Sequence, residues 1–178
     1  MTDGRVYVIG TFDTKAEELS YVARLIRATG INVTTVDVGT TESSAEADIP
    51  AHDVASHHPE GAARVLEAGD RGKAVMAMSE ALTRFVASRT DIAGIVGLGG
   101  SGGTSLITPA MRALPLGVPK LMVSTVASGD TSGYVGVSDM TMMFPVTDIA
   151  GLNTVSRRIL ANAAHAIAGM AVGADAGT

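Results

Sequence analysis

Short apolar runs alternate with longer amphipathic stretches along the whole chain. Four runs have the length and the β-branched content of buried strands, and they cover residues 6–9, 33–38, 92–96 and 120–124. Residues 135–144 predict a turn into a fifth strand. The stretches between the runs carry apolar side chains at helical spacing. This alternation predicts a parallel sheet whose strands are joined by right-handed helical crossovers.

The expected fold is therefore an α/β three-layer sandwich, Rossmann-like or flavodoxin-like, with a five-stranded, mostly parallel sheet. The expected strand order is 2-1-3-4-5, in one domain over residues 1–172 with a frayed tail at 173–178. In that order the winding direction reverses between the first and third strands. Ligands of open α/β sheets bind at such a reversal, beyond the carboxyl ends of the strands.

Several helices have recognisable ends. Thr14 and Glu17 form a capping box that predicts a helix from there to Gly30. Pro59 suits the first turn of a short helix that ends near Gly69. These two helices flank the second strand and the polar stretch that follows it.

The polar stretch of residues 40–58 contains His52, His57 and His58. Neighbouring histidine side chains rarely face one metal ion, and no carboxylate pattern accompanies them. A solvated loop is the favoured interpretation.

The later helices are less sharply marked. Asp70 predicts an N-cap. After the third strand, Pro109 leaves two possibilities, a kinked helix or a new helix capped by Thr108. Residues 148–153 lead into the last helix. Its predicted buried stripe is Leu152, Val155, Ile159, Ala163, Ile167 and Met170.

Five glycines occupy the seven positions 97–103, directly after the third strand. Thr104 and Ser105 predict the start of a helix behind them. Glycine is costly to order, so such a cluster indicates special backbone conformations or a close ligand approach that a Cβ would block. A strand, a glycine loop and a helix start together present free N–H groups to an anion.

Three motif templates overlap in this cluster. The first, third and sixth residues spell G-x-G-x-x-G, but the acid expected about 20 residues later is missing from 121–124. The spacing also suits a P-loop, yet Gly103 stands where the lysine belongs. G-x-S-x-G, the nucleophile elbow of hydrolases, is centred on Ser101. A tight turn without a ligand is the remaining alternative.

Composition narrows the class of protein. The chain has 178 residues, a net charge of −5, 3% aromatic residues and no cysteine. The charge gives no basic footprint for nucleic acid, and the missing cysteines exclude disulfides and thiolate chemistry. No apolar stretch approaches the length of a membrane span, and residues 1–5 do not resemble a signal peptide. A cytoplasmic protein without nucleic-acid or membrane partners is expected.

Three loops should meet at the winding reversal, namely residues 10–15, 97–104 and 124–130. Their hydroxyls and amides suit phosphate groups, with Lys15 as the obvious cation. Asp37, at the end of the second strand, could bind a ribose or stabilise a turn, and Thr14 is favoured as a cap. The predicted ligand contacts are Thr11, Asp13, Thr14, Lys15, Asp37, Gly99, Gly100, Ser101, Gly102, Gly103, Thr104, Ser124, Ser128, Gly129 and Asp130.

A triphosphate bound there would need a magnesium ion, because so few cations are available. Asp13, Asp130 and Asp139 are the candidate carboxylates. Asp130 is preferred as the Mg²⁺ ligand, since it follows a flexible Ser-Gly pair.

Six segments occur in a recognisable order. They are IGTFDTK (9–15), GLGGSGGT (97–104), PKLMVST (119–125), ASGD (127–130), SDMTMM (138–143) and DIAGLN (148–153). Together they resemble the amino-terminal domain of the Tm-1-like family, also called UPF0261, over nearly the whole chain. The resemblance implies a Rossmann-like domain, ATP binding, and relatives that continue into a second domain. We therefore expect a nucleotide-binding domain that acts with a second domain, a partner chain or further copies of itself.

Two other classes of function stay open. A serine hydrolase would use Ser101 as its nucleophile, His165 as its base, and Asp130 or Asp139 as the third member. An assembly module would use methionine-rich segments such as residues 140–144 at a subunit interface.

Overall fold

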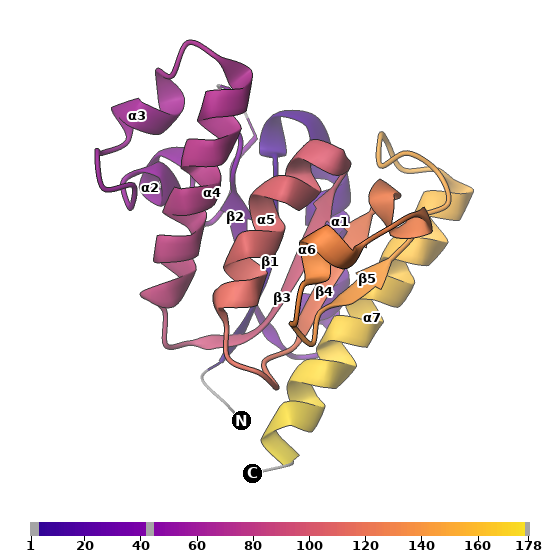
Figure 1. The fold of residues 1–178 in the computed structure, drawn as a ribbon. Helices are drawn as coiled ribbons and strands as arrows, with labels where there is room; N and C mark the ends of the chain where they lie inside the picture. The colour runs from indigo at the N-terminus through magenta and orange to yellow at the C-terminus, as the bar shows by residue number, and fades with distance from the viewer. Residues whose placement is uncertain (1–3, 42–44, 177–178) are drawn as a thin grey trace.

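A five-stranded parallel sheet forms the centre of the molecule in the computed structural model, which describes residues 4–41 and 45–176 (Figure 1). The strand order is β2-β1-β3-β4-β5, and every neighbouring pair is parallel. The strands are β1 (Arg5–Gly10), β2 (Asn32–Asp37), β3 (Ile92–Gly99), β4 (Lys120–Ser124) and β5 (Thr141–Met143). The predicted fold class and strand order are confirmed.

Helices cover both faces of the sheet and complete three layers. Figure 1 shows α4 and α5 in front of the sheet, and α1 and α7 behind it. The helices are α1 (Phe12–Ala28), α2 (Ala51–Ala55), α3 (Ala63–Leu66), α4 (Arg71–Ala87), α5 (Ser101–Ala113), α6 (Ser132–Val135) and α7 (Thr154–Ala176). A 3₁₀ turn, η1 (Thr125–Ser128), follows β4.

Two hydrophobic cores lie on opposite sides of the sheet, because successive side chains of a strand point to opposite faces. Tyr7 and Ile9 of β1 join the core under α4 and α5. Val6 and Val8 of the same strand join the core under α1 and α7. Buried alanines and methionines fill much of the space that aromatic residues occupy in other proteins.

The start of α1 differs from the prediction. The helix begins at Phe12 with Thr11 in the N-cap position, so the capping box on Thr14 and Glu17 is wrong. Thr14 Oγ1 instead lies 2.8 Å from Thr11 Oγ1. Lys15 has non-helical backbone angles, φ −134° and ψ 21°, which kink the first turn. The chain thus enters the helix three residues earlier than local signals indicate.

The region between β2 and α4 is more ordered than a solvated loop. Ile49 forms a β-bridge with Val36, and α2 follows it. His58 is buried, accepts a hydrogen bond from the Glu60 amide at 3.1 Å and lies 3.6 Å from a Glu80 oxygen. The prediction of solvated histidines is therefore wrong for His58.

Two other helices also differ from the prediction, and a third agrees with it. The helix α3 spans only Ala63–Leu66, since Gly61 has a φ of +83° and interrupts the turn before it. The helix α5 begins at Ser101 rather than Thr104 and continues through Pro109 as one helix. Asp70 caps α4 as predicted, accepting from the Lys73 amide at 2.9 Å.

The last helix turns a different face to the sheet than predicted. Val155 and Met170 of the predicted stripe are exposed, while Ala163 and Ile167 are buried. The adjacent Ala164 and Ala168 are buried as well. The stripe of α7 that contacts the sheet is therefore offset by about one position from the predicted stripe. The helix also continues to Ala176, through most of the predicted tail, and residues 177–178 lie outside the described residues.

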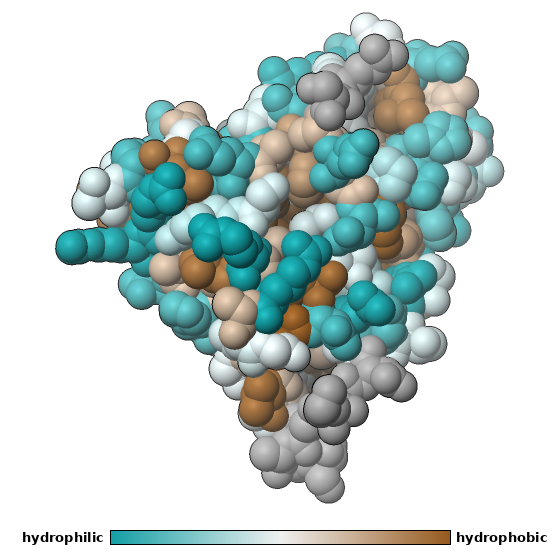
Figure 2. All heavy atoms as spheres, turned by 180° about the vertical axis from the view of Figure 1, so that it is seen from behind, coloured by the Kyte–Doolittle hydropathy of each residue, from teal (hydrophilic) through white to brown (hydrophobic). Residues whose placement is uncertain are grey.

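The back of the molecule, seen in Figure 2, shows apolar atoms in small separate areas between hydrophilic residues. Such scattered exposure is ordinary for a protein surface. Among the described residues, no helix is long and apolar enough to cross a membrane.

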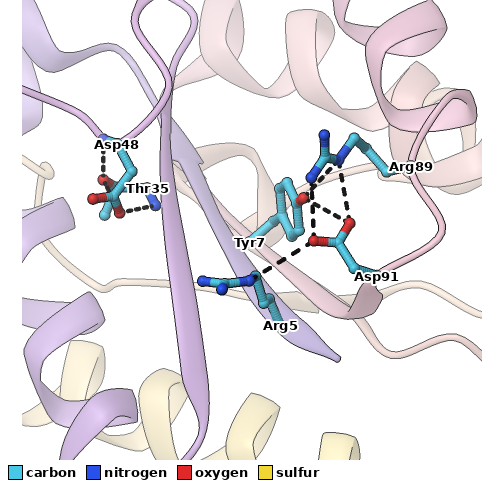
Figure 3. A network of polar contacts seen from close by, with 6 residues as sticks. All are labelled: Arg5, Tyr7, Thr35, Asp48, Arg89 and Asp91. Atoms are coloured by element: carbon cyan, nitrogen blue, oxygen red, sulfur yellow. Dashed lines mark hydrogen bonds and ion pairs between the residues drawn. The ribbon is translucent and has the colours of Figure 1, made fainter. Parts of the chain in front are cut away.

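A polar network ties the beginnings of β1 and β3 together (Figure 3). The buried Tyr7 hydroxyl donates to Asp91 at 3.0 Å and accepts from Arg89 Nε at 2.9 Å. Burial and the Asp91 carboxylate raise the pKa of Tyr7 above its usual value. Burial alone would raise the pKa of Asp91, but the hydrogen bonds from Arg89 and Tyr7 outweigh it and lower that pKa. The network satisfies the hydroxyl that β1, buried on both faces, takes into the core.

A second polar pair fixes the start of β4. Lys120 is fully buried, and its ammonium donates to Pro115 O and Val118 O at 2.8 Å each and to Asp139 Oδ1 at 2.6 Å. The hydrogen bonds from Lys120 and from the Gly117 amide lower the pKa of Asp139 below the usual 3.8. Asp139 therefore lies at the amino ends of the strands, and the prediction that it could hold magnesium at the carboxyl ends is wrong.

We expect Asp139→Asn to lower the free energy of unfolding at pH 7 by about 1–2 kcal/mol. This is the contribution of a charge-assisted hydrogen bond, reduced because the Asp139 side chain is partly exposed. Because the folded-state pKa of Asp139 is depressed, its contribution is complete above pH 3.8 and is lost as the pH falls below that value. Urea denaturation at pH 7 and at pH 3 should show the difference between variant and wild type shrinking in acid. The exposed Glu17→Gln is the control, and a pH-independent difference would contradict the role of the pair.

Candidate ligand-binding site

A cleft of about 700 Å³ opens at the carboxyl ends of β1, β2 and β3. It lies at the winding reversal between β1 and β3, where the topology predicts a ligand. Nine of the predicted contacts line it: Thr11, Asp13, Thr14, Lys15, Gly99, Gly100, Ser101, Gly102 and Gly103. Six do not: Asp37, Thr104, Ser124, Ser128, Gly129 and Asp130.

Two of the five clustered glycines are required by packing. A Cβ on Gly97 would come within 2.7 Å of Met122 Sδ in the core. A Cβ on Gly99 would come within 2.9 Å of Gly103 Cα, because the first turn of α5 passes directly over the end of β3. Strand and helix can approach this closely only without a side chain at Gly99.

The other three glycines have no such internal reason. A Cβ would make only ordinary contacts of 3.7 Å at Gly100 and Gly103, and would meet nothing within 4 Å at Gly102. None of the three has a left-handed backbone conformation. All three line the cleft. Their lack of side chains therefore serves the open space of the cleft rather than the fold.

The first turn of α5 offers backbone donors to that space. The first amide to bond back into the helix is that of Thr104, which donates to Gly100 O at 2.9 Å. The amides of Ser101, Gly102 and Gly103 precede it and have no helical carbonyl to receive them. They carry the positive end of the helix dipole, so an anion is the ligand that they suit.

Thr104 and Ser124 lie beneath this turn rather than in the cleft. Both are fully buried, and their hydroxyl oxygens lie 2.5 Å apart. Thr104 also donates to Gly100 O at 2.7 Å, and Ser124 accepts from the Val126 amide at 3.2 Å. This pair anchors α5 to the end of β4 and thereby sets the position of the glycine turn.

Asp37 also has an internal task. It is buried, and its Oδ1 accepts from the Phe12 amide at 3.0 Å and from the Gly39 amide at 2.8 Å. Burial raises the pKa of this carboxyl, although the two amide donors oppose the shift. Of the two interpretations of Asp37, the geometry favours the stabilised turn, which joins the ends of β1 and β2.

Asp130 lies outside the cleft as well. It is exposed, and its Oδ1 accepts from the Ser132 amide at 2.9 Å before α6. Hydrogen bonds from the side chain and the backbone of Ser132 lower the pKa of Asp130. Ser128 is exposed and donates to Thr125 O at 3.3 Å. Thr125, which follows the buried Ser124, lies close to the glycine turn, 3.7 Å from a Cβ placed on Gly100.

The β1–α1 turn contributes both charges and hydroxyls. Asp13 lines the cleft and accepts a hydrogen bond from Thr41. The ammonium of Lys15 donates to Ile149 O at 2.9 Å, which ties α1 to the loop before α7. Glu18 accepts from the Gly151 amide of the same loop at 2.5 Å.

Sequence reasoning missed the wall formed by α3, α4 and α5. Leu66, Ala68, Ala74, Val75 and Leu106 line the cleft there with Val38 of the β2 end. The N-cap at Asp70 was the available signal, because a helix that crosses back over a parallel sheet must begin at the carboxyl edge.

Arg71, the first residue of α4, also lines the cleft and adds a cation to Lys15. The expectation that Lys15 is the cleft's only obvious cation is thus wrong. Asp13 and Asp70 also line the cleft, and their two negative charges balance the positive charges of Lys15 and Arg71. Among the described residues, no three or more His, Asp or Glu side chains cluster closely enough to hold a metal ion by themselves.

The geometry does not assemble a serine hydrolase. Ser101 lies in the first turn of α5 without the positive φ that strains a nucleophile elbow. His165 is exposed on α7, and no histidine occurs among the described residues that line the cleft. Ser101 therefore has no base within reach.

The fold is that of a Rossmann-like α/β domain with a cleft at its switch point. The profile of the UPF0261 family's N-terminal domain, a family described as uncharacterised, matches residues 4–176. The chain belongs to the UPF0261 family, as the resemblance indicated.

Relatives occur in bacteria and plants. A UPF0261 protein of Mesorhizobium japonicum is 60% identical over 94% of this chain and 42% of its own length. A Clostridium tetani UPF0261 protein is 42% identical over 95% of this chain and 43% of its own length. The tomato ToMV resistance protein Tm-1 is 44% identical over 95% of this chain and 25% of its own length. The chain thus spans less than half of the curated relatives that it matches.

Similarity to the tomato protein carries no information on resistance. The form named ToMV susceptible protein is 43% identical to this chain, almost the same value as the resistance form.

We expect opposite effects from alanine at two neighbouring glycines. Gly99→Ala should lower the free energy of unfolding by roughly 1–3 kcal/mol, because its Cβ collides with backbone that cannot move freely. Gly102→Ala should be neutral or stabilising by up to about 1 kcal/mol, because it restricts the unfolded chain and meets open space when folded. Thermal and urea denaturation of both variants measure this. Equal destabilisation would show that both glycines serve packing.

Proposed function

We propose that this domain binds ATP, with the polyphosphate held by the amides of the α5 first turn. The observation that carries the proposal is the absence of side chains at Gly100, Gly102 and Gly103, which neither backbone angles nor internal packing require. A ligand that approaches the backbone closely explains why these positions lack side chains. The free amides favour an anionic ligand. These features agree with several phosphate-containing anions. Among them, the family resemblance favours ATP.

The size and charge of the cleft support a polyphosphate ligand bound with magnesium. A volume of about 700 Å³ lies within the range of small-molecule sites. Lys15 and Arg71 are matched by Asp13 and Asp70, so the side chains supply no net positive charge. Magnesium bound to phosphate oxygens usually needs only one or two protein carboxylates, so a preformed metal cluster is unnecessary.

Asp13 is the carboxylate best placed for that ion, because it lines the cleft beside the β1–α1 turn. The sequence favoured Asp130, which lies outside the cleft-lining residues. We therefore assign the magnesium contact to Asp13.

A second domain is the partner that we propose for this unit. The chain covers 42% of the bacterial relatives at about 60% identity. The cleft lies at an open edge of the sheet, where a further domain can close over a bound ligand. A homo-oligomer is the alternative partner, and the two differ in whether sedimentation of this chain depends on concentration.

We expect Gly102→Val to weaken Mg-ATP binding by roughly 10–100-fold, because its side chain blocks the approach of phosphate to the amides that would donate hydrogen bonds to it. Isothermal titration calorimetry measures the affinity, and circular dichroism checks the fold. Gly133→Val is the matched control, since Gly133 occupies the same helix position in α6, has open space around it and lies outside the cleft. Unchanged affinity in folded Gly102→Val would remove this turn from the site.

We also expect ATP affinity to fall by on the order of 10–100-fold in EDTA. Two unit charges about 4 Å apart repel by about 4 kcal/mol at an effective dielectric of about 20, and the amides offset only part of this. Asp13→Asn should weaken Mg-ATP binding, while Asp130→Asn should leave it unchanged. Equal affinity with and without magnesium would contradict the metal-bridged arrangement.

A further inference from the structure

The cleft has two chemically different ends. One end carries the glycine turn, Thr11 and Lys15, which suit phosphate. The wall formed by α3, α4 and α5, which we call the apolar end, carries Leu66, Ala68, Ala74, Val75 and Leu106, with Asp70 and Arg71 between them in the sequence. These five side chains are aliphatic, and none of them carries a charge or a hydrogen-bonding group. A ligand that fills both ends must therefore combine a polyphosphate with a flat or apolar group.

Free backbone groups border the apolar end. The segment 67–70 joins α3 to α4 without secondary structure of its own. Within the described residues, no hydrogen bond involves the amides of Ala68 and Gly69 or the carbonyls of Glu67, Ala68 and Gly69. Gly69 has a φ of +68°, a conformation that suits glycine. Donors and acceptors thus alternate along a short stretch of accessible chain.

We propose that the apolar end holds the base of the bound nucleotide, and that the backbone of Ala68 and Gly69 pairs with the edge of that base. This inference rests on the proposed function and adds the location and mode of base recognition. A nucleobase has apolar faces and an edge of mixed donors and acceptors, which matches an aliphatic wall beside free amides and carbonyls. A wall without aromatic side chains holds the base by aliphatic contact rather than by stacking.

The assignment gives each wall a separate task. The phosphate end binds the charged phosphate groups, so it contributes equally to the affinity for every polyphosphate. The apolar end contributes only to ligands that carry a base. Affinity for ATP and affinity for inorganic tripolyphosphate therefore separate the two ends experimentally.

The test compares Mg-ATP with Mg-tripolyphosphate by calorimetry on the full chain. Wild-type protein should bind ATP roughly tenfold or more tightly than tripolyphosphate, since burial of the base adds apolar contact. This comparison needs no variant. Equal affinities would overturn the inference while leaving the phosphate site in place, and failure of both ligands to bind would overturn the proposed function itself.

A substitution then locates the base. Ala68→Trp fills the apolar end from a half-exposed position and should reduce ATP affinity to that of tripolyphosphate, with tripolyphosphate binding unchanged within about twofold. Ala63→Trp, exposed on α3 and outside the cleft, is the matched control and should bind both ligands like wild type. Retained ATP affinity in Ala68→Trp would overturn the inference. Parallel loss of both ligands would overturn it too, because the effect would then not be specific to the base.

Discussion

The close passage of α5 over the end of β3 is the contact on which the site depends. A Cβ on Gly99 would lie only 2.9 Å from Gly103 Cα. The two residues can pack this closely because Gly99 has no side chain. The buried Thr104–Ser124 pair fixes the same turn to β4. With the turn held from two sides, its leading amides face the cleft rather than a neighbouring strand. A preorganised donor set of this kind needs little rearrangement to meet an anion.

The two edges of the sheet have different roles. At the amino edge, polar groups are satisfied internally, by the Tyr7–Arg89–Asp91 network (Figure 3) and by the three acceptors around Lys120. At the carboxyl edge, the amides of Ser101, Gly102 and Gly103 in the α5 turn and those of Ala68 and Gly69 have no partner among the described residues. The described polar groups at the amino edge are thus used for internal contacts, while the carboxyl edge leaves backbone donors open to the cleft.

The segments that carry the family resemblance divide along the same line. Residues 9–15 and 97–104 contribute to the cleft. Lys120 and Asp139 belong to two other segments and form a buried ion pair at the opposite edge. Residues 148–153 form hydrogen bonds with Lys15 and Glu18 of α1 and so hold the β1–α1 turn in place. Segments 9–15 and 97–104 thus form cleft walls, and segment 148–153 supports one of them from behind.

The sequence by itself determined the strands, their order and the glycine turn, because β-branched runs, crossover handedness and clustered glycine are local signals. Tertiary structure decided which polar residues face the cleft. Thr104 lies in a predicted loop and Asp37 at the end of a predicted strand, yet packing buries both as supports. Neither Arg71 nor the aliphatic wall of α3 and α4 carries a motif. They reach the cleft only because parallel crossovers bring helix starts to one edge, which no stretch of sequence shows locally.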